Sequence, residues 1–286
     1  MIVITAASGN LGRLVLDDLL GRGVPAAGIR AVVRDPAKLA DHAERGVEVV
    51  HGDYTDPQSL VAALAGAEKL LLISSHGSGE ERIKHHLNAV AAAKETGVKH
   101  LVYTSIVHAE DNAIAFSWVH KDTETAIVES GIPFTFLRNN WYFENTTGTI
   151  GAALEHGAFI GAAGEGRIAN AARADYAAAA AVVLTGEGHE GKVYELTGDV
   201  AITQAELAAE VTAQSGKQVV FAPLSEQEYA KALEGFGLPA ELAADVAQAD
   251  VAISQGALAE TTDTLATLIG RPTTTLAEAV AQALGK

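Results

Sequence analysis

Residues near the N-terminus have the types and the spacing that bind the phosphates of a nucleotide. Residues 6–10 are small or turn-prone, and they stand between an apolar run at 1–5 and apolar residues at helical spacing from Leu11 onward. A strand, a short turn and a helix start in this order direct backbone N–H groups at a phosphate. We expect Gly9 to permit the turn and Gly12 to let the helix lie close to the strand. An ordinary connection between strand and helix fits the same residues.

A pair of basic residues follows about 20 residues after this turn. Arg34 stands at the end of the expected second strand, and Lys38 lies one helical turn further on. An acidic residue at this place binds the ribose 2′-hydroxyl of NAD, whereas an arginine accommodates the 2′-phosphate of NADP. Asp35 is expected to point to the other side of the chain. The pair therefore predicts NADP(H) in preference to NAD(H), with solvated surface charges as the alternative.

Histidines supply the candidate acid. His120 and Glu124 are four residues apart, which places both on one face of a helix. The ordinary pKa of histidine lies near neutrality, so His120 is the candidate general acid. The sequence favours the alternative, a surface histidine paired with Glu124. Adjacent His85 and His86 diverge by ~100° around a helix, so we expect solvated side chains there and no metal site.

Aromatic residues that could hold a flat ring cluster in two short segments: Phe116, Trp118, Trp141, Tyr142 and Phe143. Ring faces of this kind stack on planar substrates and bury them. Asn140 and Asn145 could donate hydrogen bonds to an acceptor oxygen or bind the nicotinamide amide. Each residue alone is more typical of core packing, but the cluster predicts an acceptor pocket. Phe134 and Phe136 are expected in the core.

Strands and helices that alternate through the first half would position these residues. Strands are expected at 1–5, 28–34, 47–50, 69–73, 100–104 and 133–137, with helices at 11–20, 36–43, 57–65, 80–96 and 117–130. This alternation predicts an α/β fold with a Rossmann-type, doubly wound parallel sheet. Ligands of such sheets bind beyond the carboxyl ends of the strands. Two groups of residues follow strands at this edge: Ser74, Ser75 and His76, and Thr104 and Ser105.

The alternation stops after Asn139. A segment rich in Gly, Asn and Thr surrounds a short helix at 150–156, and a helix at 173–184 precedes a possible edge strand at 192–196. Helices follow to the end, two of them beginning with capping boxes at Thr203 and Thr275. The prediction is a nucleotide-binding domain at 1–139, to which an edge strand near 192–197 returns. Residues 140–286 would form a smaller, mostly helical substrate-binding cap, with 161–166 as a mobile flap or a plain surface loop.

Composition limits the class of protein. The chain has 286 residues, 48% of them hydrophobic, a formal net charge of −16 and no cysteine. The negative charge argues against nucleic acid as a partner, and the lack of cysteine excludes disulfides and thiolate metal sites. No stretch has the roughly 20 apolar residues of a membrane span, and no basic segment precedes an apolar run. We expect a soluble cytoplasmic protein.

Eight segments together resemble one family over nearly the whole chain. They are 5–12, 33–38, 52–54, 70–75, 103–105, 137–145, 153–162 and 188–196. They resemble the NmrA-like branch of the atypical short-chain dehydrogenases, with most similarity to bacterial NAD(P)H:quinone oxidoreductases of type 2 and, next, to triphenylmethane-dye reductases. The family turn usually begins with glycine where this chain has Ala6, so we expect reduced cofactor affinity or a reshaped turn.

The resemblance also implies an activity. Ordinary short-chain dehydrogenases use a Tyr-x-x-x-Lys motif, and here the corresponding helix has His120 in place of the tyrosine. A ketone needs an acid when it accepts hydride, whereas a quinone gives a delocalised phenolate that can take its proton from water. We therefore expect an NADPH-dependent quinone reductase with direct hydride transfer and no flavin. The alternatives are an NADP-binding redox sensor without turnover and a reductase of triphenylmethane or azo dyes.

The motifs and the resemblance together assign roles to individual positions. The expected cofactor residues are Ala6, Ser8, Gly9, Asn10, Leu11, Arg34, Lys38, Asp53, Tyr54, Ser74, Ser75, His76, Thr104, Ser105 and Asn139. The expected residues around a quinone or another planar aromatic acceptor are Trp118, Asn140, Trp141, Tyr142, Phe143 and Asn145. The catalytic candidates are His120 and Asn145.

Overall fold

The computed structural model describes residues 1–286, which divide into two compact units. Unit 1 comprises Met1–Ala109, Trp118–Asn139 and Tyr176–Glu195. Unit 2 comprises Glu110–Ser117, Asn140–Asp175 and Leu196–Lys286. No helix of the protein combines the length and the apolar character needed to cross a membrane.

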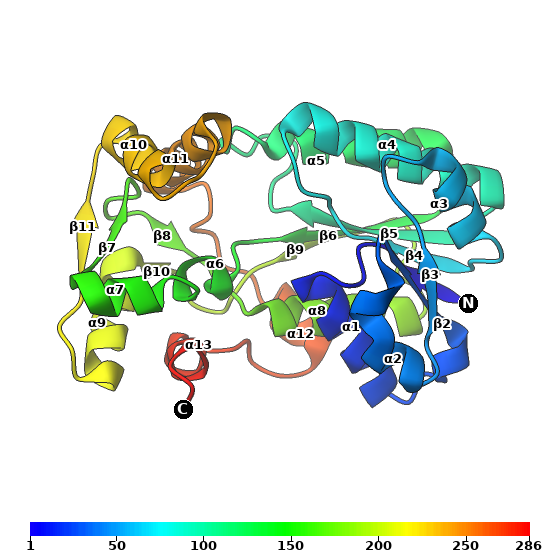
Figure 1. The fold of residues 1–286 in the computed structure, drawn as a ribbon, viewed down its shortest axis with the longest axis horizontal. Coiled ribbons are helices and arrows are strands. Elements are labelled where there is room, and N and C mark those ends of the chain that lie inside the picture. The colour runs from blue at the N-terminus through cyan, green and yellow to red at the C-terminus, as the bar shows by residue number, and fades with distance from the viewer. The chain divides into compact units, whose positions relative to one another are not determined.

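A seven-stranded sheet forms the centre of unit 1 (Figure 1). Its strands are β1 (Ile2–Ile4), β2 (Ile29–Val33), β3 (Glu48–His51), β4 (Lys69–Leu72), β5 (His100–Ile106), β6 (Phe134–Asn139) and β9 (Lys192–Leu196). The order is β3-β2-β1-β4-β5-β6-β9, and the pairs from β3 to β6 are parallel. The order reverses between β1 and β4, as in a doubly wound sheet. The fold prediction is therefore confirmed, including the edge strand.

Helices cover both faces of this sheet. They are α1 (Asn10–Gly21), α2 (Ala40–Glu44), α3 (Pro57–Leu64), α4 (Gly79–Thr96), α5 (Ser117–Ser130) and α8 (Arg173–Thr185). In Figure 1, α3, α4 and α5 lie on one face, while α1, α2 and α8 lie on the other. Leu60, Ala89 and Ile127 from the first three helices pack with Leu101 and Phe136 of the strands in one buried core. The central strands β1 and β4 are covered on both sides, and their residues 2–4 and 70–72 are apolar without alternation.

The helix expected at 36–43 forms in two parts. A 3₁₀ turn, η2 (Pro36–Leu39), comes first, and α2 follows it. The N–H of Lys38 donates to the carbonyl of Asp35 at 3.1 Å, an i to i+3 bond that tightens the turn. The carboxylate of Asp35 accepts from the N–H of Ala37 at 3.1 Å and caps this turn. The carboxylate of Asp35 is thus bound within its own turn.

Unit 2 is helical with two small sheets. Its helices are α6 (Phe143–Thr147), α7 (Ile150–His156), α9 (Gln204–Ser215), α10 (Glu226–Gly235), α11 (Ala240–Ser254), α12 (Thr264–Ile269) and α13 (Leu276–Ala283). Strand β7 (Ala158–Gly161) pairs in parallel with β11 (Val220–Pro223), and β8 (Arg167–Ile168) pairs antiparallel with β10 (Ile202–Thr203). Both predicted capping boxes form, at α9 and α13. The sequence missed β7, β8 and β10, because two to four residues are too few to show a period.

The segment at 161–166 is packed against α11. A Cβ atom on Gly161 would lie 2.7 Å from the carboxylate of Asp250, and one on Gly166 would lie 2.5 Å from the carbonyl oxygen of Ile253. The N–H of Ala162 donates to Asp250 at 2.7 Å. Both ends of the segment are therefore in close contact with a helix, which favours a packed loop over a mobile flap at these positions.

Asp250 is expected to make the free energy of unfolding depend on pH. Its burial raises the pKa of the carboxyl from 3.8 to about 6, although the N–H groups of Ala162 and Ala163 oppose the shift. The folded protein therefore favours the protonated carboxyl of Asp250. The contribution of this group to the free energy of unfolding is fully present below pH 4 and falls by up to about 3 kcal/mol as the pH rises through 6. We expect Asp250→Asn to raise the melting temperature at pH 7.5 and to flatten the melting curve's pH dependence between pH 4 and 7.

Thermal melts at several pH values measure this effect. Asp245→Asn, on the same helix, is the matched control and should keep the pH dependence of the parent protein. If Asp250→Asn and Asp245→Asn gave parallel curves across this range, a raised pKa at Asp250 would be refuted.

Candidate functional site

A cavity of about 480 Å³ lies in unit 1 beyond the carboxyl ends of β1, β2, β3 and β4. Most positions predicted to bind the cofactor line it: Ala6, Ser8, Gly9, Arg34, Lys38, Asp53, Tyr54, Ser74, Ser75 and His76. They come from four separate strand ends, which the parallel sheet brings to one edge. The structure thus assembles the predicted turn and the predicted basic pair around one space.

The N-terminus of α1 has no protein group that caps it. Gly9 is its N-cap residue, no side chain bonds to the first-turn N–H groups, and the first turn contains no acidic residue. By contrast, α4, α9, α10 and α13 all begin with complete capping boxes. The first N–H groups of a helix need partners, and the positive end of the helix dipole favours an anion. The cavity therefore presents an anion-binding helix start of the kind that holds a pyrophosphate.

The turn before α1 owes its shape to Ala6. Its φ of 49° lies in the left-handed region, whereas Gly9 has an ordinary φ of −73°. A Cβ atom on Gly9 would lie only 3.2 Å from the carbonyl oxygen of Ala6, so Gly9 serves the turn by its lack of a side chain and not by a left-handed φ. Gly12 does allow a close approach, because a Cβ atom there would lie 2.7 Å from the Cα of Ala7. A left-handed alanine costs about 1 kcal/mol, which is a physical reason to expect glycine at this position.

We expect Ala6→Gly to tighten NADPH binding by a few fold. Glycine adopts the left-handed conformation without strain and removes a methyl group that lines the cavity, although its greater freedom in the unfolded chain offsets about 0.5–1 kcal/mol. The melting temperature should therefore change little. Titration calorimetry with NADPH measures the affinity. Ala7→Gly serves as the control, because Ala7 is fully buried and has no left-handed φ; it should destabilise the protein instead.

Arg34 and Lys38 form a basic end of the cavity. The imidazole of His51 lies 3.0 Å from the carbonyl oxygen of Arg34, and the guanidinium of Arg13 donates to the carbonyl of Lys38 and to Asp41. These contacts fix the backbone that carries both cations. Asp53 faces the same space, but the N–H of Thr55 and then the charge of Arg34 hold the pKa of its carboxyl below the usual range. A doubly charged anion such as a 2′-phosphate fits this end by charge.

Tyr54 joins two strand ends at the cavity wall. Its hydroxyl oxygen lies 2.6 Å from both the hydroxyl of Thr5 and the carbonyl oxygen of Ile73. Burial raises the pKa of the phenol, so Tyr54 stays protonated. The ring of His85 stacks on Tyr54 with centroids 6.2 Å apart, and His85 also lines the cavity. His85 is therefore part of the cavity wall, where a solvated side chain is expected from the sequence; its place on the helix after the fourth strand is the only signal in the sequence.

His86 holds the backbone that follows β4. It is fully buried, and its Nε2 accepts from the N–H of Ser75 at 2.9 Å. Its Nδ1 lies 2.8 Å from the hydroxyl of Thr123, which itself donates to the carbonyl of Val119. The ring is therefore neutral with its proton on Nδ1, and burial lowers its pKa to about 3. The expectation of a solvated His86 is wrong. No group of three or more potential ligands could hold a metal ion.

The surroundings of His120 do not favour the role of a general acid. It is buried, with its Nε2 3.0 Å from the guanidinium of Arg82 and its Nδ1 2.9 Å from the hydroxyl of Tyr103. Burial and the charge of Arg82 hold the pKa of the imidazole well below its ordinary value. The favoured interpretation of a surface pair with Glu124 is wrong, because Glu124 is buried and bonds to Arg138 and Ser105.

Five predicted cofactor positions do not line the cavity: Asn10, Leu11, Thr104, Ser105 and Asn139. Leu11 is buried in the core. Thr104 and Ser105 lie inside β5, which extends to Ile106, and Asn139 is the last residue of β6. The hydroxyl of Thr104 accepts from the N–H of Ser74 at 2.9 Å, so it acts on the cavity only through the backbone of a residue that lines it.

Two of the predicted acceptor residues are structural. The side chain of Asn140 is used within unit 2, where its Nδ2 donates to the carbonyl of Leu258 and its Oδ1 accepts from the N–H of Trp141. Phe143 is buried in the core of unit 2 with Ile150 and Phe159. These positions therefore do not present free groups to a ligand.

The other predicted acceptor residues keep part of their surface exposed. In unit 2, Trp141 stacks on Phe116 with centroids 6.4 Å apart, and Tyr142 and Asn145 both contact Arg173. In unit 1, Trp118 is 40% exposed, and its ring lies against Gly79, where a Cβ atom would be 2.6 Å away.

A Rossmann-type sheet with an uncapped phosphate-binding helix and a basic pair defines a nucleotide-binding protein, and residues 6–187 match the NAD(P)H-binding family. The chain belongs to this family. Quinone oxidoreductase 2 of Escherichia coli K12 is 52% identical over 98% of this chain and 97% of that protein. The crystal structure of an NADPH-dependent quinone oxidoreductase of E. coli complexed with NADPH superimposes with a TM-score of 0.95, over 99% of this chain and 100% of that one.

A second solved structure is also similar over the full length. Triphenylmethane reductase of Citrobacter sp., complexed with NADP(H), has 43% identity and a TM-score of 0.93, over 99% of this chain and 100% of that one. The two solved relatives are named for different acceptors, a quinone and a triphenylmethane dye, and both structures contain the same kind of cofactor, NADPH or NADP(H).

Proposed function

We propose that this protein is an NADPH-dependent quinone reductase that transfers hydride directly from the nicotinamide to a quinone, without flavin. One observation carries the proposal: an anion-binding helix start and the pair Arg34 and Lys38 share one cavity, in a chain 52% identical throughout to a quinone oxidoreductase. NADPH supplies the hydride when bound. The protein binds NADPH and the quinone, orients them for the transfer and excludes water from the site.

Each part of the cavity receives a share of the nucleotide in this proposal. The first-turn N–H groups of α1 bind the pyrophosphate, and Arg34 and Lys38 bind the 2′-phosphate. Ser74, Ser75 and His76 are assigned to the nicotinamide half, since they follow the strand on the far side of β1 from Arg34. NADPH is preferred over NADH because only NADPH carries the anion that the basic pair recognises.

The helix at 117–130 lacks a proton donor, and this favours an acceptor that needs none. His120 is neutral and its two ring nitrogens already contact Arg82 and Tyr103, so it offers no proton to a developing alkoxide. A quinone needs none at that moment, because its reduced anion is delocalised. We assign Trp118, Trp141, Tyr142 and Asn145 to the acceptor. Residues 1–139, with the edge strand near 192–197, are assigned to the nucleotide-binding domain, and the rest of 140–286 to the acceptor-binding domain. A cytoplasmic location belongs to the same proposal.

Mixing the purified protein with NADPH and a panel of acceptors tests this function. We expect rapid loss of the reduced-nicotinamide absorbance with simple quinones and none with aliphatic ketones. A triphenylmethane dye is included because of the similarity to the Citrobacter reductase. NADPH binding without oxidation by any acceptor would instead favour a redox sensor.

A further inference from the structure

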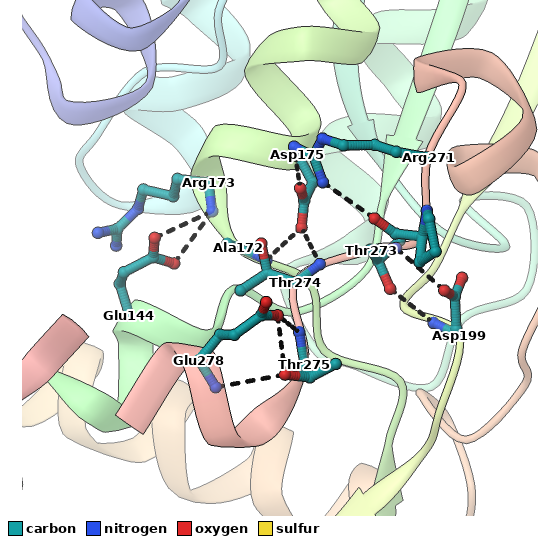
Figure 2. Close-up of polar contacts among 11 residues, drawn as sticks. Glu144, Ala172, Arg173, Asp175, Asp199, Arg271, Thr273, Thr274, Thr275 and Glu278 are labelled. Atoms are coloured by element: carbon teal, nitrogen blue, oxygen red, sulfur yellow. Dashed lines mark hydrogen bonds and ion pairs between the residues drawn. The ribbon is translucent and has the colours of Figure 1, made fainter. Parts of the chain in front are cut away.

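Arg173 contacts three residues of the segment that carries the proposed acceptor-binding side chains. Its backbone N–H donates to both carboxylate oxygens of Glu144, at 3.0 and 3.1 Å. Its guanidinium donates to Oδ1 of Asn145 at 3.1 Å and lies 5.2 Å from the ring centroid of Tyr142. Figure 2 shows Arg173 beside Glu144 at the start of α8. One residue therefore binds Tyr142 and Asn145 at once, by a cation–π contact and a hydrogen bond.

The backbone at Arg173 is held firmly. Asp175, two residues on, is fully buried, and its Oδ2 accepts from the N–H groups of Ala172 and Thr274. Its Oδ1 lies 2.7 Å from the guanidinium of Arg271. These contacts tie the first turn of α8 to the C-terminal segment, as Figure 2 shows. These contacts thus fix the backbone that carries the guanidinium of Arg173, whereas Asn145 is exposed and lies on a helix of only five residues.

The hydrogen bond from Arg173 also decides which way the amide of Asn145 faces. A guanidinium can only donate, so the atom that faces it must be the amide oxygen. The NH₂ group of Asn145 then points away from Arg173 as a donor. A donor at this place binds an oxygen that accepts hydrogen bonds, and it binds that oxygen more strongly as negative charge develops on it.

We infer that Arg173 is a specificity-determining residue that orients Asn145 as a hydrogen-bond donor to the carbonyl oxygen of the acceptor. The inference rests on the proposed function. Hydride adds to the quinone with its electron pair as the C–H bond of NADPH breaks, and the negative charge that results on oxygen faces the NH₂ group of Asn145. Water then protonates the hydroquinone anion. A cationic triphenylmethane dye takes hydride at carbon and loses charge, so it gains nothing from this donor.

Steady-state kinetics of variants with para-benzoquinone and with a triphenylmethane dye test the inference. We expect Arg173→Met to lower kcat for the quinone by about tenfold to a hundredfold, the order of effect of losing one donor to an oxyanion. Turnover of the dye and the affinity for NADPH should change less than about threefold. Asn145→Asp should cause a similar loss with the quinone, and the double variant should lose little more than either, because the two residues act as one unit.

Two further variants keep the test decisive. Arg173→Lys retains a donor and a charge and should recover most quinone turnover, which would settle the matter even if Arg173→Met folded poorly. Arg167→Met is the matched control, because Arg167 is a half-exposed arginine of the same unit that pairs with Glu206; it should behave as the parent. Binding of hydroquinone in the presence of NADP⁺, measured by calorimetry, should weaken in Arg173→Met and not in Arg167→Met.

The outcomes separate this inference from the function on which it rests. If the parent protein turns over quinones but Arg173→Met does so at an unchanged rate, or loses quinone and dye turnover equally, the orienting role is refuted alone. If the parent protein oxidises NADPH with no quinone, the proposed function fails and the inference fails with it.

Discussion

Arg34→Glu is expected to weaken NADPH binding by about a hundredfold. The substitution removes charge-assisted hydrogen bonds worth about 1.5–3 kcal/mol each and places a carboxylate against a phosphate, for a total loss near 3 kcal/mol. NADH lacks the 2′-phosphate, so its affinity should change less than about threefold, and a carboxylate at this place can accept a bond from the free 2′-hydroxyl. Titration calorimetry with both nucleotides at one ionic strength measures the two affinities, because salt screens such contacts.

A charge-matched control separates the local contact from the overall field. Arg45→Glu makes the same change of charge at a residue that pairs with Asp17 at 2.5 Å and does not line the cavity. Its effect on either nucleotide should be small. Equal losses of NADPH and NADH affinity in Arg34→Glu would refute the assignment of the 2′-phosphate to this residue.

Local patterns were sufficient to predict the sheet and this end of the cavity. Strands such as β1 and β4 are short apolar or β-branched runs, and helices such as α4 begin and end at residues with known capping preferences, Ser78 and Gly97. The turn before α1 and the basic pair after β2 are also local, and both line the cavity. Each of these features depends on residues that are neighbours in the chain.

Strand ends were less predictable, and this explains the errors at the carboxyl edge. The fifth strand was expected to stop at Thr104 but continues to Ile106, and the sixth continues to Asn139. Polar residues at 104, 105 and 139 resemble the start of a loop in sequence. They remain in the sheet because partners elsewhere bind them: the hydroxyl of Ser105, for example, donates to Glu124 at 2.6 Å. Sequence spacing does not reveal such partners.

The largest error of prediction concerns the polar side chains of the helix at 117–130, which are buried. The spacing of His120 and Glu124 correctly predicts one helix face, but it cannot show whether that face meets water. The answer depends on Arg82, Tyr103 and Arg138, which come from other helices and strands of unit 1. A face of α5 that looks polar in sequence is therefore an interior polar network.

This network predicts a large effect on stability. Arg138, on β6, lies between two carboxylates: its Nη2 is 2.5 Å from Glu124, and its Nη1 is 2.9 Å from Glu195. The side chains of Arg138 and Glu124 are 6% and 9% exposed. We expect Arg138→Met to destabilise the protein by about 3–5 kcal/mol, because it leaves a buried carboxylate without its counter-charge. Chemical denaturation measures the loss.

A double variant tests whether the buried charge is the cause. Adding Glu124→Gln to Arg138→Met removes the unpaired carboxylate, so the double variant should be more stable than Arg138→Met alone despite carrying one more substitution. The exposed pair of Arg167 and Glu206, 3.1 Å apart with both side chains about half exposed, gives the comparison, since Arg167→Met should cost less than about 1 kcal/mol. A loss of that small size in Arg138→Met, or a double variant less stable than the single one, would show that the ion pair does not determine the stability of this part of the sheet.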